Sequence, residues 1–244
     1  MEEYLYPHFY TIENTHWWFA ARQRILWEFM EKKLHLPSGT KLLDVGCGTG
    51  AILDMLSKKY QTYGQDVSPQ AIEFCRQRGL KNLYSGTLDH VPKEYGSFDV
   101  VTLLDVLEHI DDDAGALRNI NALLNDRGIV LITVPAFPAL WGAHDVVTHH
   151  KRRYVRDSLW AVVEGAGFTI EHIAYFNFFL FPVALVRRTI ARITGASDAT
   201  DLEIPPKLVN GTLRTIFEFE KYLVPRVKFP FVLSLICVAR KRVR

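Results

Sequence analysis

Short apolar runs alternate with helix-like segments along most of this 244-residue chain, and this alternation limits the fold more than any other feature. Uninterrupted apolar runs such as Val100–Leu104 are typical of strands that are buried on both faces. Their alternation with helices predicts a mostly parallel sheet that helices cover on both sides. Seven strands are expected, over residues 41–45, 61–67, 82–86, 98–106, 129–135, 168–175 and 231–240.

Helices are expected before and between these strands. Apolar residues at helical spacing predict a first helix over 16–35, which Pro37-Ser38-Gly39 ends. A later helix over 157–165 is expected to begin at a cap formed by Asp157 and Ser158. The others are expected over 51–59, 69–78 and 114–124.

The overall composition excludes several classes of protein. The net charge is only +2, so no polyanionic partner is implied. The three cysteines match neither a zinc site nor a redox pair, which favours a reducing, cytoplasmic compartment. The longest apolar stretch, residues 173–186, is shorter than the roughly 20 residues that a membrane-spanning helix needs. No secretory signal is visible at the N-terminus.

A glycine-rich loop follows the first expected strand. Gly46-Cys47-Gly48-Thr49-Gly50 precedes a helix, and Asp66 ends the second strand 20 residues after Gly46. Glycines allow a tight turn and a close approach of the backbone to a ligand, whose negative end meets the helix N-terminus. A carboxylate such as Asp66 can accept hydrogen bonds from both ribose hydroxyls. The loop therefore predicts a nucleotide-ribose site, without choosing between cofactors.

Acidic residues around the loop favour a cationic ligand over a dinucleotide. Asp44 stands two residues before the first glycine, and Asp105 and Glu108 follow the fourth expected strand. A fixed carboxylate repels a pyrophosphate. S-adenosylmethionine instead carries a sulfonium, an ammonium and one carboxylate. The charges therefore favour S-adenosylmethionine, with S-adenosylhomocysteine as product, over NAD.

Several segments, in the right order, resemble the motifs of class I, Rossmann-like methyltransferases. Residues 42–50 resemble motif I, 64–69 the ribose motif, 97–109 the fourth-strand motif and 128–135 the fifth strand. The flanking His16-Trp17-Trp18-Phe19 and His150-Lys151-Arg152-Arg153-Tyr154 resemble a bacterial and archaeal subgroup associated with glycan or lipid-linked sugar pathways. The resemblance implies an α/β fold with a Rossmann-like, mostly parallel seven-stranded sheet.

The sequence predicts a division into four segments, although strands six and seven of this fold normally form a close antiparallel pair. Residues 1–38 form an N-terminal helical cap, and residues 39–175 form the cofactor-binding methyltransferase core. Residues 176–230 form a long helical insertion between strands six and seven, and 231–244 supply the last strand and a basic tail. In the cap, the aromatic Trp17, Trp18 and Phe19 either cover the cofactor or only fill the core.

The residues around the glycine loop take their expected roles from the same resemblance. Gly46 and Gly48 line the methionine part of the cofactor, and Asp44 organises the loop and reaches the ammonium through water. Asp66 holds the ribose, and Val67 packs on one face of the adenine.

The adenine edge is where this chain departs from the family pattern. Thr87 occupies the place of the usual acid, and Asp89 stands two residues later. Both a bond from Thr87 to N6 and a movement of Asp89 toward the adenine are left open. The expected cofactor set is completed by Cys47, Leu88, Asp105 and Arg22, of which Arg22 meets the methionine carboxylate.

Methyl transfer from a sulfonium is an in-line displacement that requires alignment and often removal of a proton from the acceptor. The loop after the fifth strand contains the candidate bases His144, Asp145 and His149. His149 is favoured because it lies closest to residues 152–154, which can anchor an acceptor; an exposed polar loop is the alternative. A metal site of His144, Asp145, His149 and His150 is not required by the chemistry, so no metal is predicted.

The expected acceptor is a small molecule, a glycan or a lipid-linked compound. Nucleic acid is disfavoured, because the chain lacks a dense basic stripe and the Asn/Asp-Pro-Pro-Tyr/Phe segment of nucleobase enzymes. In the insertion, apolar residues 178–186 precede Arg187, Arg188 and Arg192. This order fits peripheral contact with the inner face of a membrane, and equally a lid or a homodimer contact. An NAD-dependent oxidoreductase and a non-catalytic cofactor-binding scaffold are the competing functions.

Overall fold

Seven strands form one sheet in the computed structural model, which describes residues 4–179, 203–224 and 233–243, except the side chains of residues 143 and 144. The strands lie in the order β3-β2-β1-β4-β5-β7-β6. β7 pairs antiparallel with β5 and β6, and the other pairs are parallel. The predicted sheet is confirmed. The strands are β1 (Lys41–Val45), β2 (Gln61–Asp66), β3 (Leu83–Ser85), β4 (Phe98–Leu104), β5 (Leu124–Pro135), β6 (Phe168–Phe176) and β7 (Ser234–Lys241).

The two faces of the sheet have separate apolar cores, because side chains alternate along each strand. Leu42 and Val100, which are paired in register on β1 and β4, belong to one core. Their neighbours Leu43 and Val101 belong to the other. All four are fully buried, which explains why these strands read as continuous apolar runs.

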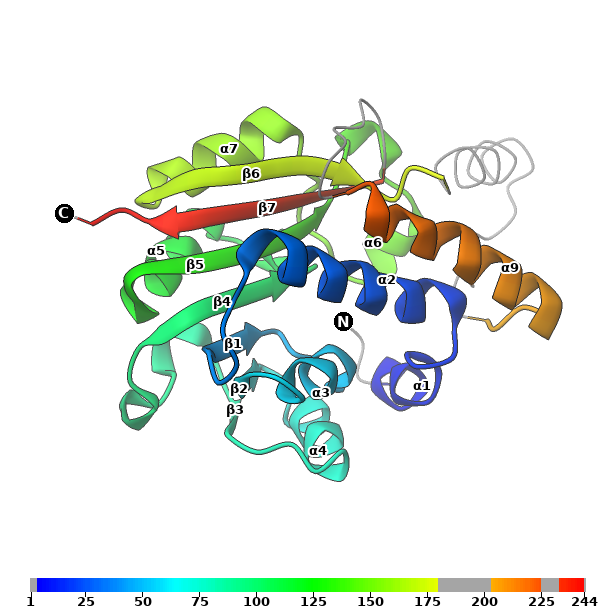
Figure 1. Cartoon of the computed structure of the whole chain (residues 1–244), viewed down its shortest axis with the longest axis horizontal. Helices are drawn as coiled ribbons and strands as arrows, with labels where there is room; N and C mark the ends of the chain where they lie inside the picture. The colour runs from blue at the N-terminus through cyan, green and yellow to red at the C-terminus, as the bar shows by residue number, and fades with distance from the viewer. Residues whose placement is uncertain (1–3, 180–202, 225–232, 244) are drawn as a thin grey trace.

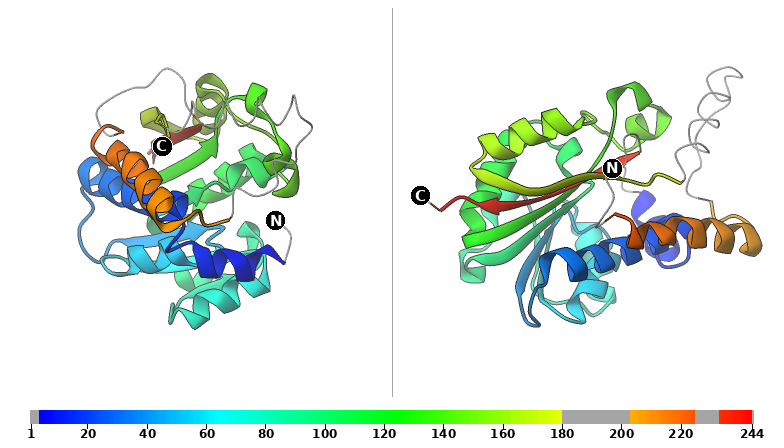
Figure 2. Two further views of the ribbon diagram at one scale, coloured as in Figure 1. Left: turned by 90° about the vertical axis from the view of Figure 1, so that its right-hand side faces the viewer. Right: turned by 45° about the horizontal axis from the view of Figure 1, so that its top comes forward.

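Helices cover both faces of the sheet, as Figure 1 and Figure 2 show. α5 (Asp113–Leu123) and α7 (Arg156–Gly165) pack on the core that contains Leu43. α2 (Trp17–Phe29) and α9 (Lys207–Glu218) lie side by side on the other core. α3 (Ala51–Ser57) and α4 (Pro69–Gln77) contact β2.

The N-terminal segment is helical, as predicted, but it contains one helix more than expected. α1 (Leu5–Ile12) spans eight residues, which is too short for a helical period to stand out from the sequence. α2 continues into a π-helical turn (Met30–Leu34), and Asn210 of α9 accepts a hydrogen bond from the Trp17 amide at 2.9 Å. The described part of the insertion therefore packs on the N-terminal segment. The four-segment division itself stays a prediction.

Most element boundaries differ from the sequence prediction by one to several residues, and local contacts explain two of these differences. α7 begins at Arg156, and Asp157 is not its cap; the Ser158 hydroxyl instead accepts a hydrogen bond from the Val155 amide at 3.0 Å. β5 begins at Leu124, earlier than expected, because Leu124 pairs with Phe98 of β4. The first residues expected for the last strand, 231–232, and most of the apolar insertion, 180–192, lie outside the described residues.

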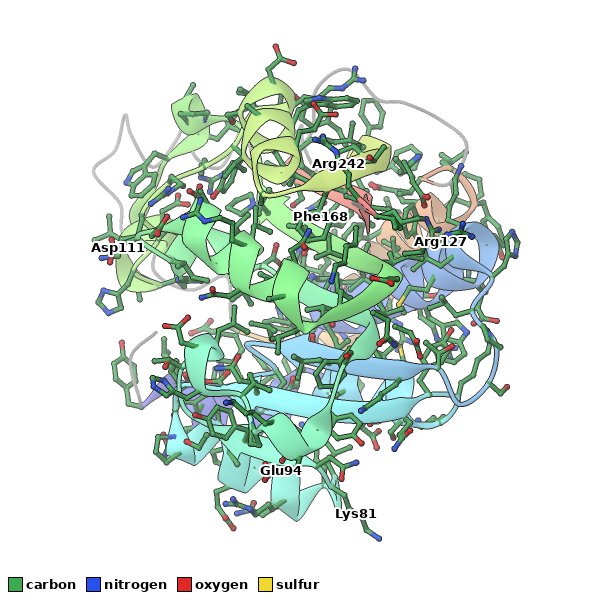
Figure 3. All side chains as sticks on the ribbon, turned by 90° about the vertical axis from the view of Figure 1, so that its left-hand side faces the viewer. Lys81, Glu94, Asp111, Arg127, Phe168 and Arg242 are labelled. Carbon is green, nitrogen blue, oxygen red and sulfur yellow. The ribbon has the colours of Figure 1, made fainter. Side chains whose placement is uncertain are left out.

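Many large apolar side chains lie inside the molecule, and many charged ones lie on its surface. In Figure 3, Lys81 and Glu94 point outward, whereas the fully buried Phe168 lies within the structure. None of the helices in the described ranges is long and apolar enough to cross a membrane. In parallel sheets of this kind, ligands bind beyond the carboxyl ends of the strands, so the site is to be sought there.

Candidate functional site

The glycine loop joins β1 to α3 at the carboxyl edge of the sheet. Gly46 has φ +66°, and a side chain there would collide with Val106. Gly48 also has a positive φ, +55°, with open space where a side chain would lie. A ligand therefore has room beside the backbone of Gly48, which suits the expected role of this residue in lining a cofactor. Cys47 is buried behind the loop, its sulfur 3.9 Å from that of Cys75.

Asp66 closes the other side of this loop. Its carboxylate accepts hydrogen bonds from the amides of Gly48 and Ser68, each at 2.9 Å. Burial raises the pKa of Asp66, and these amide bonds oppose the rise. Val67 is 66% exposed, which is unusual for a valine next to a buried strand. An exposed valine beside a fixed carboxylate suits the expected stacking of an adenine next to a bound ribose.

Asp44 lies beneath the loop and is buried. Its Oδ1 accepts a hydrogen bond of 2.6 Å from the hydroxyl of Thr102 on β4. Burial raises the pKa of Asp44 to about 7, against the effects of the Thr102 bond and of Arg22. A cation bound nearby would therefore favour the ionised form of Asp44.

Arg22 reaches from α2 over the carboxyl edge of the sheet. Its Nη2 lies 2.7 Å from Oδ2 of Asp105 and donates to the Thr133 hydroxyl at 3.3 Å, and its guanidinium stacks on Trp18. Asp105 has φ +61°, so the chain turns sharply directly after β4. Strained backbone of this kind is common at functional sites. The structure thus brings Arg22 and Asp105 together, and Trp18 positions Arg22.

A second arginine and acid connect α1 to the glycine loop. Arg78 donates to the carbonyl of Thr49 at 2.7 Å and pairs with Glu13 at 3.0 Å. Burial raises the pKa of Glu13 to about 7, and Arg78 opposes this rise. Neither Glu13 nor Arg78 is among the predicted site residues, because the sequence pattern does not predict α1.

The segment expected to contact the adenine edge is exposed. The Thr87 hydroxyl lies 3.0 Å from Nδ1 of His90, and Asp89 accepts a hydrogen bond from Asn119 on α5. Leu88 is half-buried between them. Gln65 donates to the carbonyl of Gly86, which links this segment to β2. Neither Thr87 nor Asp89 is favoured over the other by these contacts.

The loop after β5 is organised by a buried carboxylate. Asp145 on α6 (Ala143–Val147) forms a two-pronged ion pair with Arg153, at 2.7 and 2.9 Å, and its Oδ1 lies 2.7 Å from Nδ1 of His150. Burial opposes ionisation, but the bonds from His150 and Arg153 hold the pKa of Asp145 well below its usual range. Asp145 has no exposed side-chain surface, so it orients its neighbours.

Two further titratable side chains lie beside His150, on the short 3₁₀ helix Leu107–His109 that follows β4. The carboxylate of Glu108 is fully buried, and neither oxygen has a hydrogen-bond partner among the described residues. Burial, and then the charge of Asp105, raises the pKa of Glu108. Burial also lowers the pKa of His109 to about 4. From the sequence, Glu108 is expected only as a nearby negative charge, and His109 has no expected role.

The two histidines expected to act as bases lie near this group. His149 is exposed, has φ +60°, and its backbone is hydrogen-bonded to the ring of His109. His144 lies on α6, and its side chain is outside what the structure describes. The predicted site residues thus share one edge of the sheet.

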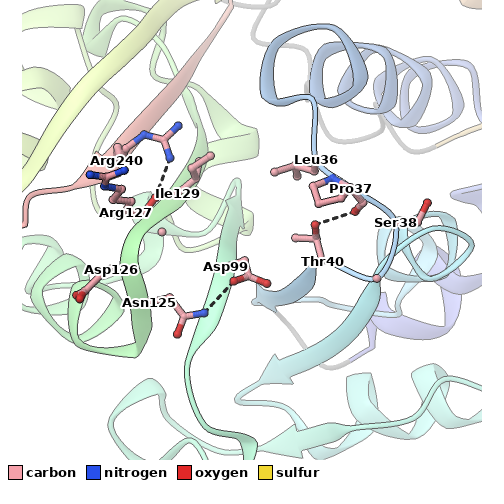
Figure 4. A pocket seen from close by; sticks show the side chains of 12 residues that line it. Leu36, Pro37, Ser38, Thr40, Asp99, Asn125, Asp126, Arg127, Ile129 and Arg240 are labelled. Atoms are coloured by element: carbon pink, nitrogen blue, oxygen red, sulfur yellow. Dashed lines mark hydrogen bonds between the residues drawn. The ribbon is translucent and has the colours of Figure 1, made fainter.

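A hollow of about 440 Å³ lies at the opposite edge. Figure 4 shows it between the turn at Leu36–Thr40 and the start of β5, with Asp99 and Arg240 on its walls. Its polar groups bond to one another: Asn125 donates to Asp99 at 2.8 Å, and Arg240 donates to the carbonyl of Arg127 at 2.8 Å. No predicted site residue lines it, so the hollow is separate from the candidate site.

Comparison with known proteins identifies relatives of the chain. A family model described as a methyltransferase domain matches residues 10–173. A ubiquinone biosynthesis O-methyltransferase from Xanthomonas axonopodis pv. citri is 26% identical over 186 residues, which cover 65% of this chain and 77% of the relative.

Solved structures share the fold at low identity. The N-methyltransferase NodS from Bradyrhizobium japonicum, in complex with S-adenosyl-L-homocysteine, has a TM-score of 0.55 at 14% identity, over 91% of this chain and 87% of NodS. The [4+2]-cyclase SpnF has a TM-score of 0.58 at 22% identity, over 92% of this chain and 82% of SpnF. A cyclase among these structures means that the fold alone does not define the chemistry.

Proposed function

Because the chain belongs to the methyltransferase-domain family and uses S-adenosylmethionine as its cofactor, we propose that it methylates a hydroxyl oxygen of an amphipathic small-molecule or lipid-linked acceptor. Membership of the methyltransferase-domain family argues against the alternative function of an NAD-dependent oxidoreductase. The proposal depends chiefly on one arrangement: Asp44 and Asp105 lie with Arg22 around an open glycine backbone. This arrangement offers carboxylates to the cofactor's ammonium and sulfonium, and a guanidinium to its carboxylate.

The nature of the acceptor is inferred from two observations. The relative from Xanthomonas is named for O-methylation in ubiquinone biosynthesis. In addition, α9 exposes apolar side chains, including Leu208 at 83% and Phe219, just beyond the helix, at 54%. An amphipathic acceptor suits such a surface. Peripheral contact with the cytoplasmic face of a membrane, and an acceptor that carries a lipid-linked sugar, are part of the same proposal.

Proton removal from the acceptor is assigned to the loop after β5. We propose His149 as general base and His144 as the second candidate. His149 is exposed and adjoins the buried group around His150. Asp145, also a candidate from the sequence, is instead assigned a positioning role, because its carboxylate is buried against Arg153 and His150.

The test uses methyl-labelled S-adenosylmethionine with a lipid extract and with soluble hydroxylated aromatic compounds. Label is expected in an ether of an amphipathic product. His149→Ala should lower turnover about 10²- to 10⁴-fold without changing S-adenosylhomocysteine affinity. The control His35→Asn, at an exposed position with positive φ, should leave turnover unchanged. Label on nitrogen or carbon would contradict the oxygen acceptor, and full activity of the His149 variant would remove its role as base.

A further inference from the structure

Glu108 has a buried carboxylate that no other described residue holds by a hydrogen bond. Its side chain has no exposed surface, and its nearest cationic group is the His150 ring at 3.9 Å. Leaving an ionised carboxylate buried and unpaired is costly. A positively charged ligand at its oxygens would remove that cost.

Two imidazoles lie beside this carboxylate. Nε2 of His150 is 3.9 Å from Oε1 of Glu108, and the rings of His109 and His150 meet edge to face, with centroids 4.7 Å apart. One ligand atom from each of Glu108, His109 and His150 can be chosen so that all three lie within 4.8 Å of one another. A metal ion holds such atoms about 2.0–2.2 Å away, and so about 3–3.5 Å apart. Side-chain shifts of about an ångström would therefore bring the three ligand atoms to the spacing found around a metal ion.

The surroundings of the two histidines are those of metal ligands. Nδ1 of His150 lies 2.7 Å from Oδ1 of Asp145, which the ion pair with Arg153 holds in place. A ring nitrogen of His109 bonds to the backbone of His149. Metal-binding histidines usually donate their second nitrogen to a carboxylate or a carbonyl, which fixes the ring orientation. The hydrogen bond to Asp145 leaves Nε2 of His150 directed toward Glu108.

We propose that Glu108, His109 and His150 bind one divalent transition-metal ion at the carboxyl edge of the sheet, beside the cofactor site. Two imidazoles and one carboxylate suit Zn²⁺, Mn²⁺, Co²⁺ or Fe²⁺ better than Mg²⁺. This set differs from the four-residue alternative considered from the sequence, with which it shares His150. Three protein ligands leave coordination positions open.

The open positions suggest a role that rests on the proposed function. A hydroxyl of the acceptor bound to the ion is more acidic than in water. Its proton passes to His149, its oxygen forms a bond to the methyl carbon, and the carbon–sulfur bond breaks with its electron pair moving to sulfur. The sulfonium becomes a neutral thioether, so charge and atoms balance.

Binding of the metal alone tests the site without any acceptor. Chelator-treated protein is dialysed against Zn²⁺, and bound zinc is measured for wild type, Glu108→Gln, His150→Gln and the control His35→Asn. Wild type and control should bind one ion per chain, and the two site variants should bind about 100-fold more weakly or worse. Equal binding by all four proteins, or no binding by wild type, would overturn the proposal.

A second measurement uses only the wild-type protein, so its outcome does not depend on whether a variant folds. X-ray absorption of the zinc-loaded wild type should show two imidazole nitrogens and oxygen ligands. Sulfur ligands would place the ion at Cys47, Cys75 or Cys237, and would overturn the assignment. The methyl-label assay separates the two hypotheses, since label on nitrogen or carbon would contradict the proposed hydroxyl acceptor and leave the metal site standing.

Discussion

Arg22 Nη2 and Asp105 Oδ2 lie 2.7 Å apart, although Arg22 belongs to α2 and Asp105 to the turn after β4. The side chains are 8% and 28% exposed, so the pair is shielded from solvent more than a surface ion pair. Thr133 of β5 bonds to both partners, donating to Asp105 and accepting from Arg22. The contact fixes α2 above the sheet edge where the cofactor's amino-acid part is expected.

Replacing Arg22 by Met should weaken S-adenosylhomocysteine binding about 10- to 100-fold. A hydrogen bond to a charged group contributes about 1.5–3 kcal/mol, and the substitution removes both the proposed contact with the cofactor carboxylate and the pairing with Asp105. Isothermal titration calorimetry measures the change. Arg24→Met is the matched control, because Arg24 is exposed on the same helix. Equal losses in the two variants would show that Arg22 has no specific role.

Cofactor binding should depend on pH through Asp44. Burial raises the pKa of Asp44 to about 7, so the carboxyl becomes neutral as pH falls through 7. A bound ammonium favours the ionised form, so affinity is full above pH 8 and is lost as the pH falls. S-adenosylhomocysteine should therefore bind about tenfold more weakly at pH 6 than at pH 8.

The matched variant for this prediction is Asp44→Asn, which keeps the size of the side chain but cannot ionise. It should bind S-adenosylhomocysteine more weakly at pH 8 and show less pH dependence. The dependence that remains would come from other groups such as Asp66, whose pKa burial also raises. The same pH profile in both proteins would exclude Asp44 as the titrating group.

The sheet could be predicted from sequence because its strands are buried on both faces. Short, continuous apolar runs such as Val100–Leu104 are typical of strands in a parallel sheet that helices cover on both faces. Short elements and helix ends are predicted less well. α1 has only eight residues, and the start of α7 is stabilised by the hydroxyl of Ser158, which lies inside its first turn. Such details depend on tertiary contacts that a local pattern does not contain.

The site was predictable where a motif contains its residues in one stretch. Asp44, Gly48 and Asp66 lie around one loop as expected. Thr102 and Thr133 were missed, although a polar residue inside an otherwise apolar strand is a signal that could have found them. The grouping of Glu108 with His109 and His150 was not predictable, because it joins the turn after β4 to a loop some 40 residues later.

The buried pair of Asp145 and Arg153 should be important for stability. Arg153→Met leaves the Asp145 carboxylate buried without its main partner, and breaking such a pair typically costs about 3–5 kcal/mol. Urea unfolding followed by circular dichroism measures the loss. Arg118→Met is the control, because the pair between Arg118 and Asp112 is exposed, at 3.7 Å, and should contribute about 1 kcal/mol or less. A loss for Arg153→Met no larger than for the control would contradict this.

The exposed apolar side of α9 should bring the protein to anionic membranes. Leu208 and Ile216 lie two turns apart on this helix and are 83% and 42% exposed. Burying an apolar side chain of this size in lipid contributes about 1.5–3 kcal/mol. The double variant Leu208→Ser and Ile216→Ser should therefore lower recovery with anionic vesicles at least about tenfold in a sedimentation assay at low salt.

The control for this prediction is Val155→Ser, which changes an exposed apolar position at the start of α7 and should sediment like wild type. Wild type that stays in the supernatant would rule out the membrane contact and favour the alternatives of a lid or a homodimer surface.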